Sequence, residues 1–116
     1  MNERRRASIL LFLYGAIIFL ISSMPGSSIP GQISPYSLLF HYTLYFLFSY
    51  PLLKFFHNMI DAYLFGSIYA ASDEIHQLFV PGRSCDPLDY ITDVLGLMTG
   101  MVFLILIRKH LLTEPQ

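Results

Sequence analysis

The chain has 116 residues, of which 54% are hydrophobic and only 13% are charged, with a formal net charge of −1. Soluble domains carry roughly 25% charged residues, and a domain this short has too little interior to bury so much apolar surface. The composition therefore argues against a secreted mini-protein, a nucleic-acid binder and a disordered chain, and favours a small integral membrane protein. The single cysteine, Cys85, excludes a disulfide framework within the chain.

Four segments are apolar and long enough to cross a bilayer, because one transmembrane helix needs about 20 mostly apolar residues. In chain order they are residues 7–24, 38–56, 60–79 and 87–107. We therefore predict an all-α fold, an integral membrane bundle of four transmembrane helices, as one domain over residues 1–116. The first segment follows three arginines, as in a signal peptide, but no clean small-x-small cleavage site comes after it, so we expect an uncleaved anchor.

The basic residues predict the orientation of the bundle, because Lys and Arg are enriched on the cytoplasmic side of membrane proteins. Six of the seven fall on one side of a four-span bundle, namely Arg4, Arg5, Arg6, Lys54, Arg108 and Lys109. We therefore expect both termini in the cytoplasm, and Arg83 and Cys85 on the outer side of the membrane.

The second and third segments each carry polar residues at helical spacing. In the second, His41 lies near the expected outer end, and Tyr45 lies one turn deeper on the same stripe. The third has one narrow stripe of small and polar residues, formed by Gly66, Ala70, Asp73 and Gln77. Glu74 and His76 flank this stripe, and apolar residues occupy the opposite face, so the stripe is predicted to face the interior of the bundle.

The fourth segment repeats this pattern with two carboxylates and two glycines. Asp89, Asp93, Gly96 and Gly100 share one helix face, and Gly96 and Gly100 form a GxxxG motif. Such a motif permits close approach of a neighbouring helix. The carboxylates of this segment are therefore predicted to point into the bundle as well.

The polar residues of the three segments are expected at a common depth, in the outer half of the membrane. Charged groups inside membrane spans are costly and usually mark function. We therefore predict a polar pocket that opens outward at headgroup level, with the Tyr45 hydroxyl donating into it. The alternative is an interhelical polar network that only fixes packing, which is common in membrane bundles.

The same residues carry a resemblance to a known family. The run from Ser72 to Ser84, SDEIHQLFVPGRS, is followed by Asp89, by Leu95-Gly96 and by Gly100, and His41 and Tyr45 form an earlier His-x-x-x-Tyr element. This pattern closely resembles the VanZ-like family, whose namesake is an accessory glycopeptide-resistance protein linked to teicoplanin. The resemblance implies a multi-pass protein of the bacterial plasma membrane that contributes to teicoplanin tolerance.

The chain departs from that family pattern at two places. Ser37 and Leu38 stand where the family often has an Asp-Lys pair, which removes a cation able to hold an anionic group. Asp93 stands where the family often has Asn, which adds a negative charge. Both departures weaken the transfer of a phosphate-binding role to this chain.

The candidate site residues divide by chemistry. The candidates for acid–base catalysis are Asp73, Glu74, His76 and Asp89, and the candidates for ligand binding are His41, Tyr45, Gln77, Arg83 and Asp93. The guanidinium of Arg83 can clamp a phosphate or carboxylate, or it can serve as a partner for an acidic residue of the chain. We assign no metal and no cofactor from the sequence. A metal bound by Asp73 and His76 would need a ligand from a second helix, for example His41, Asp89 or Asp93.

Three functions are consistent with these residues. The first is a binding or protective protein that engages a membrane lipid, a lipid-linked cell-wall precursor or a lipoglycopeptide antibiotic. The second is a membrane-embedded enzyme that acts on a lipid headgroup by carboxylate and histidine acid–base chemistry. The third is a proton relay or transporter, which the confinement of the charges to the outer half disfavours unless the chain forms a homo-oligomer. No nucleic-acid partner is expected.

Overall fold

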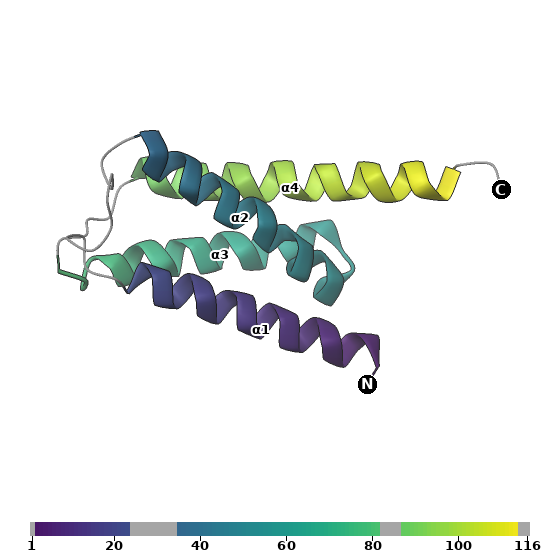
Figure 1. The fold of residues 1–116 in the computed structure, drawn as a ribbon, viewed down its shortest axis with the longest axis horizontal. Coiled ribbons are helices and arrows are strands. Elements are labelled where there is room, and N and C mark those ends of the chain that lie inside the picture. The colour runs from purple at the N-terminus through teal and green to yellow at the C-terminus, as the bar shows by residue number, and fades with distance from the viewer. Residues whose placement is uncertain (1, 24–34, 82–86, 114–116) are drawn as a thin grey trace.

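The computed structural model describes residues 2–23, 35–81 and 87–113. They form four helices: α1 (Glu3–Ser22), α2 (Pro35–Phe56), α3 (Met59–Gln77) and α4 (Pro87–Thr113). No strand occurs within these ranges. The helices lie side by side with alternating direction (Figure 1), so the predicted all-α fold is confirmed.

Local signals fix two of the helix starts and the turn between α2 and α3. The side chain of Asn2 caps α1 by accepting a hydrogen bond from the backbone N–H of Arg5, over 2.8 Å. Asn58 caps α3 in the same way through the N–H of Ile60. Between α2 and α3, His57 adopts a left-handed conformation with a φ of 58°, which ends α2 and reverses the chain in only two residues.

Two of the helices, α1 and the part of α4 up to Lys109, are long and apolar enough to cross a membrane. Large apolar side chains are nevertheless exposed on all four helices, including Phe12 of α1 (76% exposed), Leu39 of α2, Ile68 of α3 (68% exposed) and Phe103 of α4. Exposed apolar surface of this extent marks an interaction surface. The outside of the bundle is therefore suited to an apolar surrounding.

Helix α2 lies at the centre of the bundle and contacts each of the other three helices. The core that it anchors contains Tyr45, Phe48 and Leu52 from α2, together with Ile18 from α1 and Leu97 from α4. Tyrosine hydroxyls attach α1 to this core: Tyr14 donates a hydrogen bond to the Leu44 carbonyl of α2 over 2.7 Å, and Tyr69 of α3 donates to the Gly15 carbonyl. The interior therefore combines apolar packing with a few interhelical hydrogen bonds.

The GxxxG motif of α4 packs against α2, which makes the most extensive helix pair of the fold. A Cβ atom at Gly96 would lie 2.5 Å from the carbonyl oxygen of Tyr42, and one at Gly100 would lie 2.5 Å from the carbonyl oxygen of Phe46. These are backbone atoms that cannot rotate away. The two glycines therefore serve packing within the chain, where they let the backbones of α2 and α4 touch.

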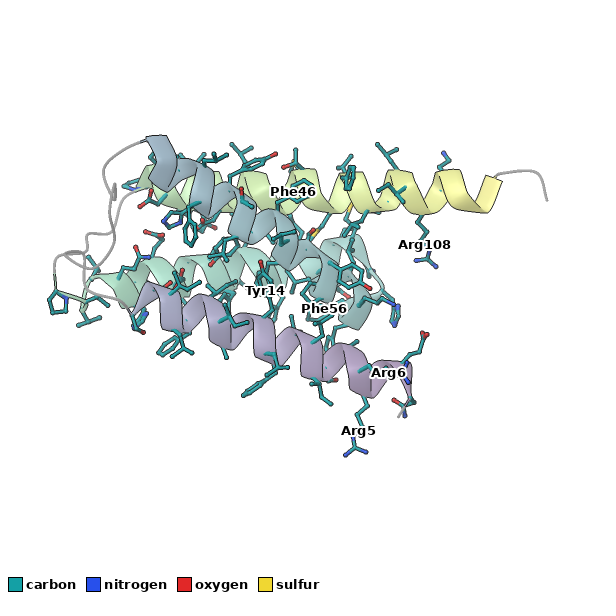
Figure 2. The ribbon with its side chains drawn as sticks, in the orientation of Figure 1. Arg5, Arg6, Tyr14, Phe46, Phe56 and Arg108 are labelled. Atoms are coloured by element: carbon teal, nitrogen blue, oxygen red, sulfur yellow. The ribbon has the colours of Figure 1, made fainter. Side chains whose placement is uncertain are left out.

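The two ends of the bundle differ in charge. The start of α1, the end of α4 and the α2–α3 turn lie at one end (Figure 1), and Arg5, Arg6 and Arg108 lie toward this end (Figure 2). Lys54, in the last turn of α2, belongs to the same end. The opposite end holds the C-terminus of α1, the N-terminus of α2, the C-terminus of α3 and the N-terminus of α4. Among the described residues, all the Lys and Arg side chains thus belong to the first of these two ends, which we call the basic end.

The close approach at Gly96 leads to a testable prediction. We expect Gly96→Ala to lower the thermal midpoint of the detergent-solubilised chain by about 5 °C or more, because α4 must move away from α2. Gly15→Ala is the matched control, since a Cβ there meets the Tyr69 hydroxyl oxygen at 3.6 Å, an ordinary van der Waals distance. Alanine also forms helices better than glycine, so this control should keep or raise the midpoint. Equal midpoints for both variants would contradict the packing described above.

Candidate functional site

Buried polar side chains gather at the end of the bundle that lies opposite the basic end. His41 comes from α2, Asp73, Glu74 and Gln77 come from α3, and Asp93 comes from α4. All five lie within two helical turns of the end of their helix, which is at most about 10 Å along the axis. We call these five residues the polar cluster.

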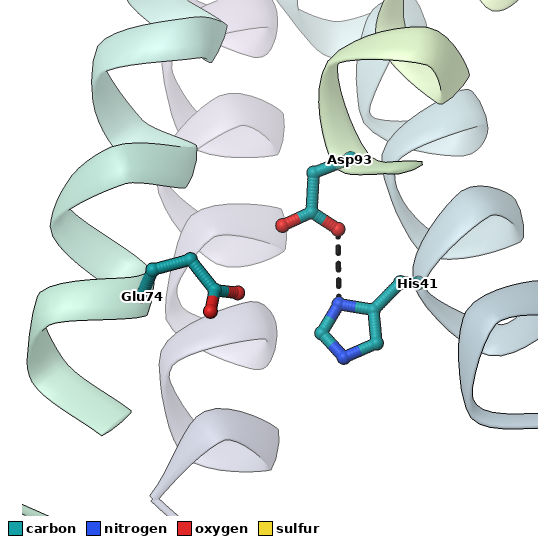
Figure 3. Close-up of side chains that lie close together, drawn as sticks. All are labelled: His41, Glu74 and Asp93. Atoms are coloured by element: carbon teal, nitrogen blue, oxygen red, sulfur yellow. Dashed lines mark hydrogen bonds and ion pairs between the residues drawn. The ribbon is translucent and has the colours of Figure 1, made fainter. Parts of the chain in front are cut away.

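The shortest side-chain contact in the polar cluster joins α2 to α4. His41 Nδ1 lies 2.9 Å from Asp93 Oδ1 (Figure 3), and Asp93 is 0% exposed. When Asp93 is ionised it only accepts hydrogen bonds, and Nδ1 is then the donor of this one. On the other side of the imidazole ring, Nε2 lies 4.0 Å from Oδ2 of Asp89, which is half-buried. His41 is thus flanked by two carboxylates of α4.

Glu74 brings a carboxylate from α3 to the same place. Figure 3 shows its side chain pointing toward the space beside His41 and Asp93. One nitrogen of His41 and one oxygen from each carboxylate all lie within 4.8 Å of one another. Three helices therefore meet at one set of metal-ligating or proton-accepting atoms.

A second contact of the polar cluster joins α2 to α3. The hydroxyl of Tyr45, which is fully buried, donates to Oδ2 of Asp73 over 3.3 Å. Tyr45 lies one turn along α2 from His41, as the stripe in the sequence predicts. The hydroxyl of Tyr45 therefore donates to Asp73, one of the four carboxylates that the structure describes at this end.

His76 points toward α1 and does not join the three converging groups. Its ring stacks on Phe19, with centroids 4.4 Å apart, and its Nε2 lies 3.3 Å from the hydroxyl oxygen of Ser23. The sequence analysis assigned no residue of α1 to the site. The only signal was the polar pair Ser22-Ser23 at the end of the first apolar segment, which by itself names no partner.

Two buried polar atoms of the cluster have no hydrogen-bond partner among the described residues. They are Oδ2 of Asp93 and Nε2 of Gln77, and both side chains are at most 1% exposed. A buried polar atom that lacks a partner costs roughly 1–3 kcal/mol. Such atoms commonly mark a place where a water, an ion or a ligand binds.

Negative charge dominates the electrostatics of this end. Asp73, Asp89 and Glu74 all interact electrostatically with His41 or with Asp93. Within the described ranges, the only basic side chains here are imidazoles, since every Lys and Arg lies toward the other end. The arrangement is therefore suited to binding a cation or exchanging protons.

The structure brings together most of the residues that the sequence singled out. His41, Glu74 and Asp93 converge, Tyr45 and Asp73 form a neighbouring pair, Asp89 borders His41, and Gln77 is buried nearby. Arg83 falls outside the described residues. The catalytic and binding roles of these residues remain predictions.

This geometry defines a class of protein: a small helical protein with an apolar exterior and a buried histidine–carboxylate cluster at one end. The family model of VanZ/LLP1 matches residues 7–108. The chain therefore belongs to the VanZ/LLP1 family, which confirms the resemblance seen in the sequence. No curated protein and no solved structure matches the chain.

The buried contact between His41 and Asp93 leads to a prediction about stability. We expect His41→Leu and Asp93→Leu each to lower the free energy of unfolding by about 1–3 kcal/mol, because each leaves a buried polar partner. The double variant should lower the free energy of unfolding by less than the sum of the two single variants, with a difference of about 0.5 kcal/mol or more. The measurement is unfolding in detergent with a chelator present.

Asp93→Asn is the matched control for this cycle. Asparagine keeps an oxygen that accepts a hydrogen bond from His41 Nδ1. Asp93→Asn should therefore lower the free energy of unfolding less than either leucine variant does. Strict additivity of the two leucine variants would show that the side chains do not interact.

Proposed function

We propose that all four helices cross the bacterial plasma membrane, with both termini in the cytoplasm, and that the polar cluster forms an outward-facing pocket. This pocket engages a cell-envelope lipid, a lipid-linked wall intermediate or a lipoglycopeptide antibiotic, and the protein thereby contributes to teicoplanin tolerance. The observation that carries the proposal is the burial of five polar side chains at the end of the bundle away from the described basic residues.

The lengths and surfaces of the helices support the four-span arrangement. The helices have 20, 22, 19 and 27 residues, and about 20 are needed to cross the apolar core of a bilayer. The members of the polar cluster on α2 and α3 are buried, and exposed apolar side chains such as Leu47 and Leu64 lie on the outer faces of these helices. Each outer face therefore suits contact with lipid.

The position of the polar cluster supports engagement of an amphiphile. A pocket within about 10 Å of the helix ends lies where lipid headgroups meet acyl chains. An amphiphile can place its polar part against the cluster and its acyl part along the apolar exterior. Membership of the VanZ/LLP1 family supports a role connected to teicoplanin.

The proposed orientation can be tested with the only cysteine of the chain. We expect Cys85 to react with a membrane-impermeant thiol reagent in intact cells, because the proposed topology puts residue 85 outside. The variant His57→Cys, in a Cys85→Ser background, is the matched control. It lies in the α2–α3 turn at the basic end, and it should react only after lysis. The reverse pattern would invert the topology.

The proposed role can be tested through susceptibility. We expect expression of the chain in a glycopeptide-susceptible host to raise the minimum inhibitory concentration of teicoplanin, and Glu74→Gln to return it to the empty-vector value. The physical reason is the loss of a buried carboxylate from the pocket. Asp61→Asn removes the same charge from the other end of α3 and should leave the value unchanged.

Membrane levels of each variant are compared by immunoblot, and Asp89→Asn replaces Glu74→Gln if the latter does not accumulate. Full protection by a variant that accumulates normally would mean that the cluster is structural.

A second candidate function is favoured by the His41–Asp93 contact. A carboxylate that accepts from one imidazole nitrogen orients the ring for proton transfer at the other nitrogen. This arrangement suits an enzyme that acts on a lipid headgroup, with Glu74 or Asp89 as the partner acid. Turnover of a purified lipid headgroup by the reconstituted protein would distinguish this function from binding alone.

A further inference from the structure

We propose that His41, Glu74 and Asp93 bind one divalent transition-metal ion between α2, α3 and α4. The proposal concerns the three side chains themselves, and it does not depend on which amphiphile the protein engages. It goes beyond the sequence, which placed these residues in three separate segments and assigned no metal.

The first argument is the convergence of the ligand types. Imidazole nitrogen and carboxylate oxygen both bind divalent transition metals. The three groups come from three different helices, and one potential ligand atom from each lies within 4.8 Å of the others. All three side chains are buried, so the surrounding apolar core would shield the ion from bulk water.

The second argument is the state of the imidazole ring. Nδ1 is the ring nitrogen that faces Asp93, over 2.9 Å, so its lone pair would bind an ion shared with that carboxylate, and the ring proton would then lie on Nε2. Metal-ligating histidines commonly donate their other ring N–H to a carboxylate, which fixes the tautomer and the orientation of the ring. Asp89, whose Oδ2 lies 4.0 Å from Nε2, is the carboxylate placed for this role.

The third argument is independent of His41 and concerns the second oxygen of Asp93. Oδ2 is fully buried and has no hydrogen-bond partner in the described part of the chain. In Figure 3 this oxygen lies on the side of Asp93 that faces Glu74. A cation between the two carboxylates would satisfy this oxygen and reduce the repulsion between them.

The distances require only a small adjustment. Two ligands that each lie about 2.1 Å from one ion are at most about 4.2 Å apart, so separations up to 4.8 Å must shorten slightly. Glu74 can provide this shift by rotating its flexible side chain.

The mixed ligand set favours Zn²⁺ or Mn²⁺ over Ca²⁺ and Mg²⁺. Calcium and magnesium prefer sites made only of oxygen ligands. Imidazole suits zinc, and carboxylate oxygens suit manganese. Three protein ligands would leave at least one position open for water or for an anionic group.

The experiment is equilibrium dialysis of the full chain in detergent after stripping with a chelator. ZnCl₂ and MnCl₂ are tested separately, and bound metal is quantified by elemental mass spectrometry. We expect saturation at one ion per chain for at least one of the two metals. Glu74→Gln and His41→Asn should each weaken binding by about tenfold or more.

The choice of variants protects the test against misfolding. In His41→Asn the amide group can still donate to Asp93, so the contact between α2 and α4 is kept while the ring nitrogen is lost. His57→Ala and Asp61→Asn remove a histidine and a carboxylate that are exposed at the other end, and both should bind like the wild type. Helical content of every variant is checked by circular dichroism.

A thermal scan gives a second readout that does not need a stable variant. The ion that binds should raise the midpoint of the wild-type chain in a concentration-dependent way. Absence of saturable binding of both metals to the wild-type chain would overturn the proposal. Binding that persists unchanged in folded Glu74→Gln or His41→Asn would overturn it too, because the ion would then lie elsewhere.

Discussion

The close contact between the backbones of α2 and α4 is the constraint on which the rest of the structure depends. It exists because Gly96 and Gly100 have no side chain, so the carbonyl groups of Tyr42 and Phe46 can approach α4 directly. Asp93 lies almost one turn before Gly96 on the same face, and the short interaxial distance brings it to 2.9 Å from His41. The helix-packing motif and the polar cluster are therefore two parts of one interface.

Helical periodicity predicted which residues of a helix face the interior, but it did not predict which neighbouring helix they contact. It correctly assigned Gly66, Ala70, Asp73 and Gln77 to the interior, and Asp93 with Gly96 and Gly100 likewise, because an inward face repeats at the helical spacing. Periodicity does not tell which neighbour a face will meet. The stacking of His76 on Phe19 could therefore not be predicted from the sequence, since it depends on the rotation of α1 relative to α3.

The polar cluster combines two properties that are usually considered separately. Its contacts join helices and so stabilise the fold, as the Tyr45–Asp73 and His41–Asp93 contacts do. The same carboxylates are close enough to repel one another, and one oxygen of Asp93 lacks a partner in the described part of the chain. A bundle that holds these groups together without satisfying all of them is prepared for a cation or a polar ligand.

The two-residue turn at His57 and Asn58 has a consequence for how the protein enters the membrane. Helix α3 carries Asp73 and Glu74 and, unlike α1 and α4, is not apolar enough by composition alone to count as a membrane span, so in the proposed topology it would partition poorly into lipid on its own. The turn is too short for α3 to be inserted apart from α2. The two helices would therefore leave the translocation machinery as one hairpin, with Asp73 already opposite Tyr45 before α4 is synthesised.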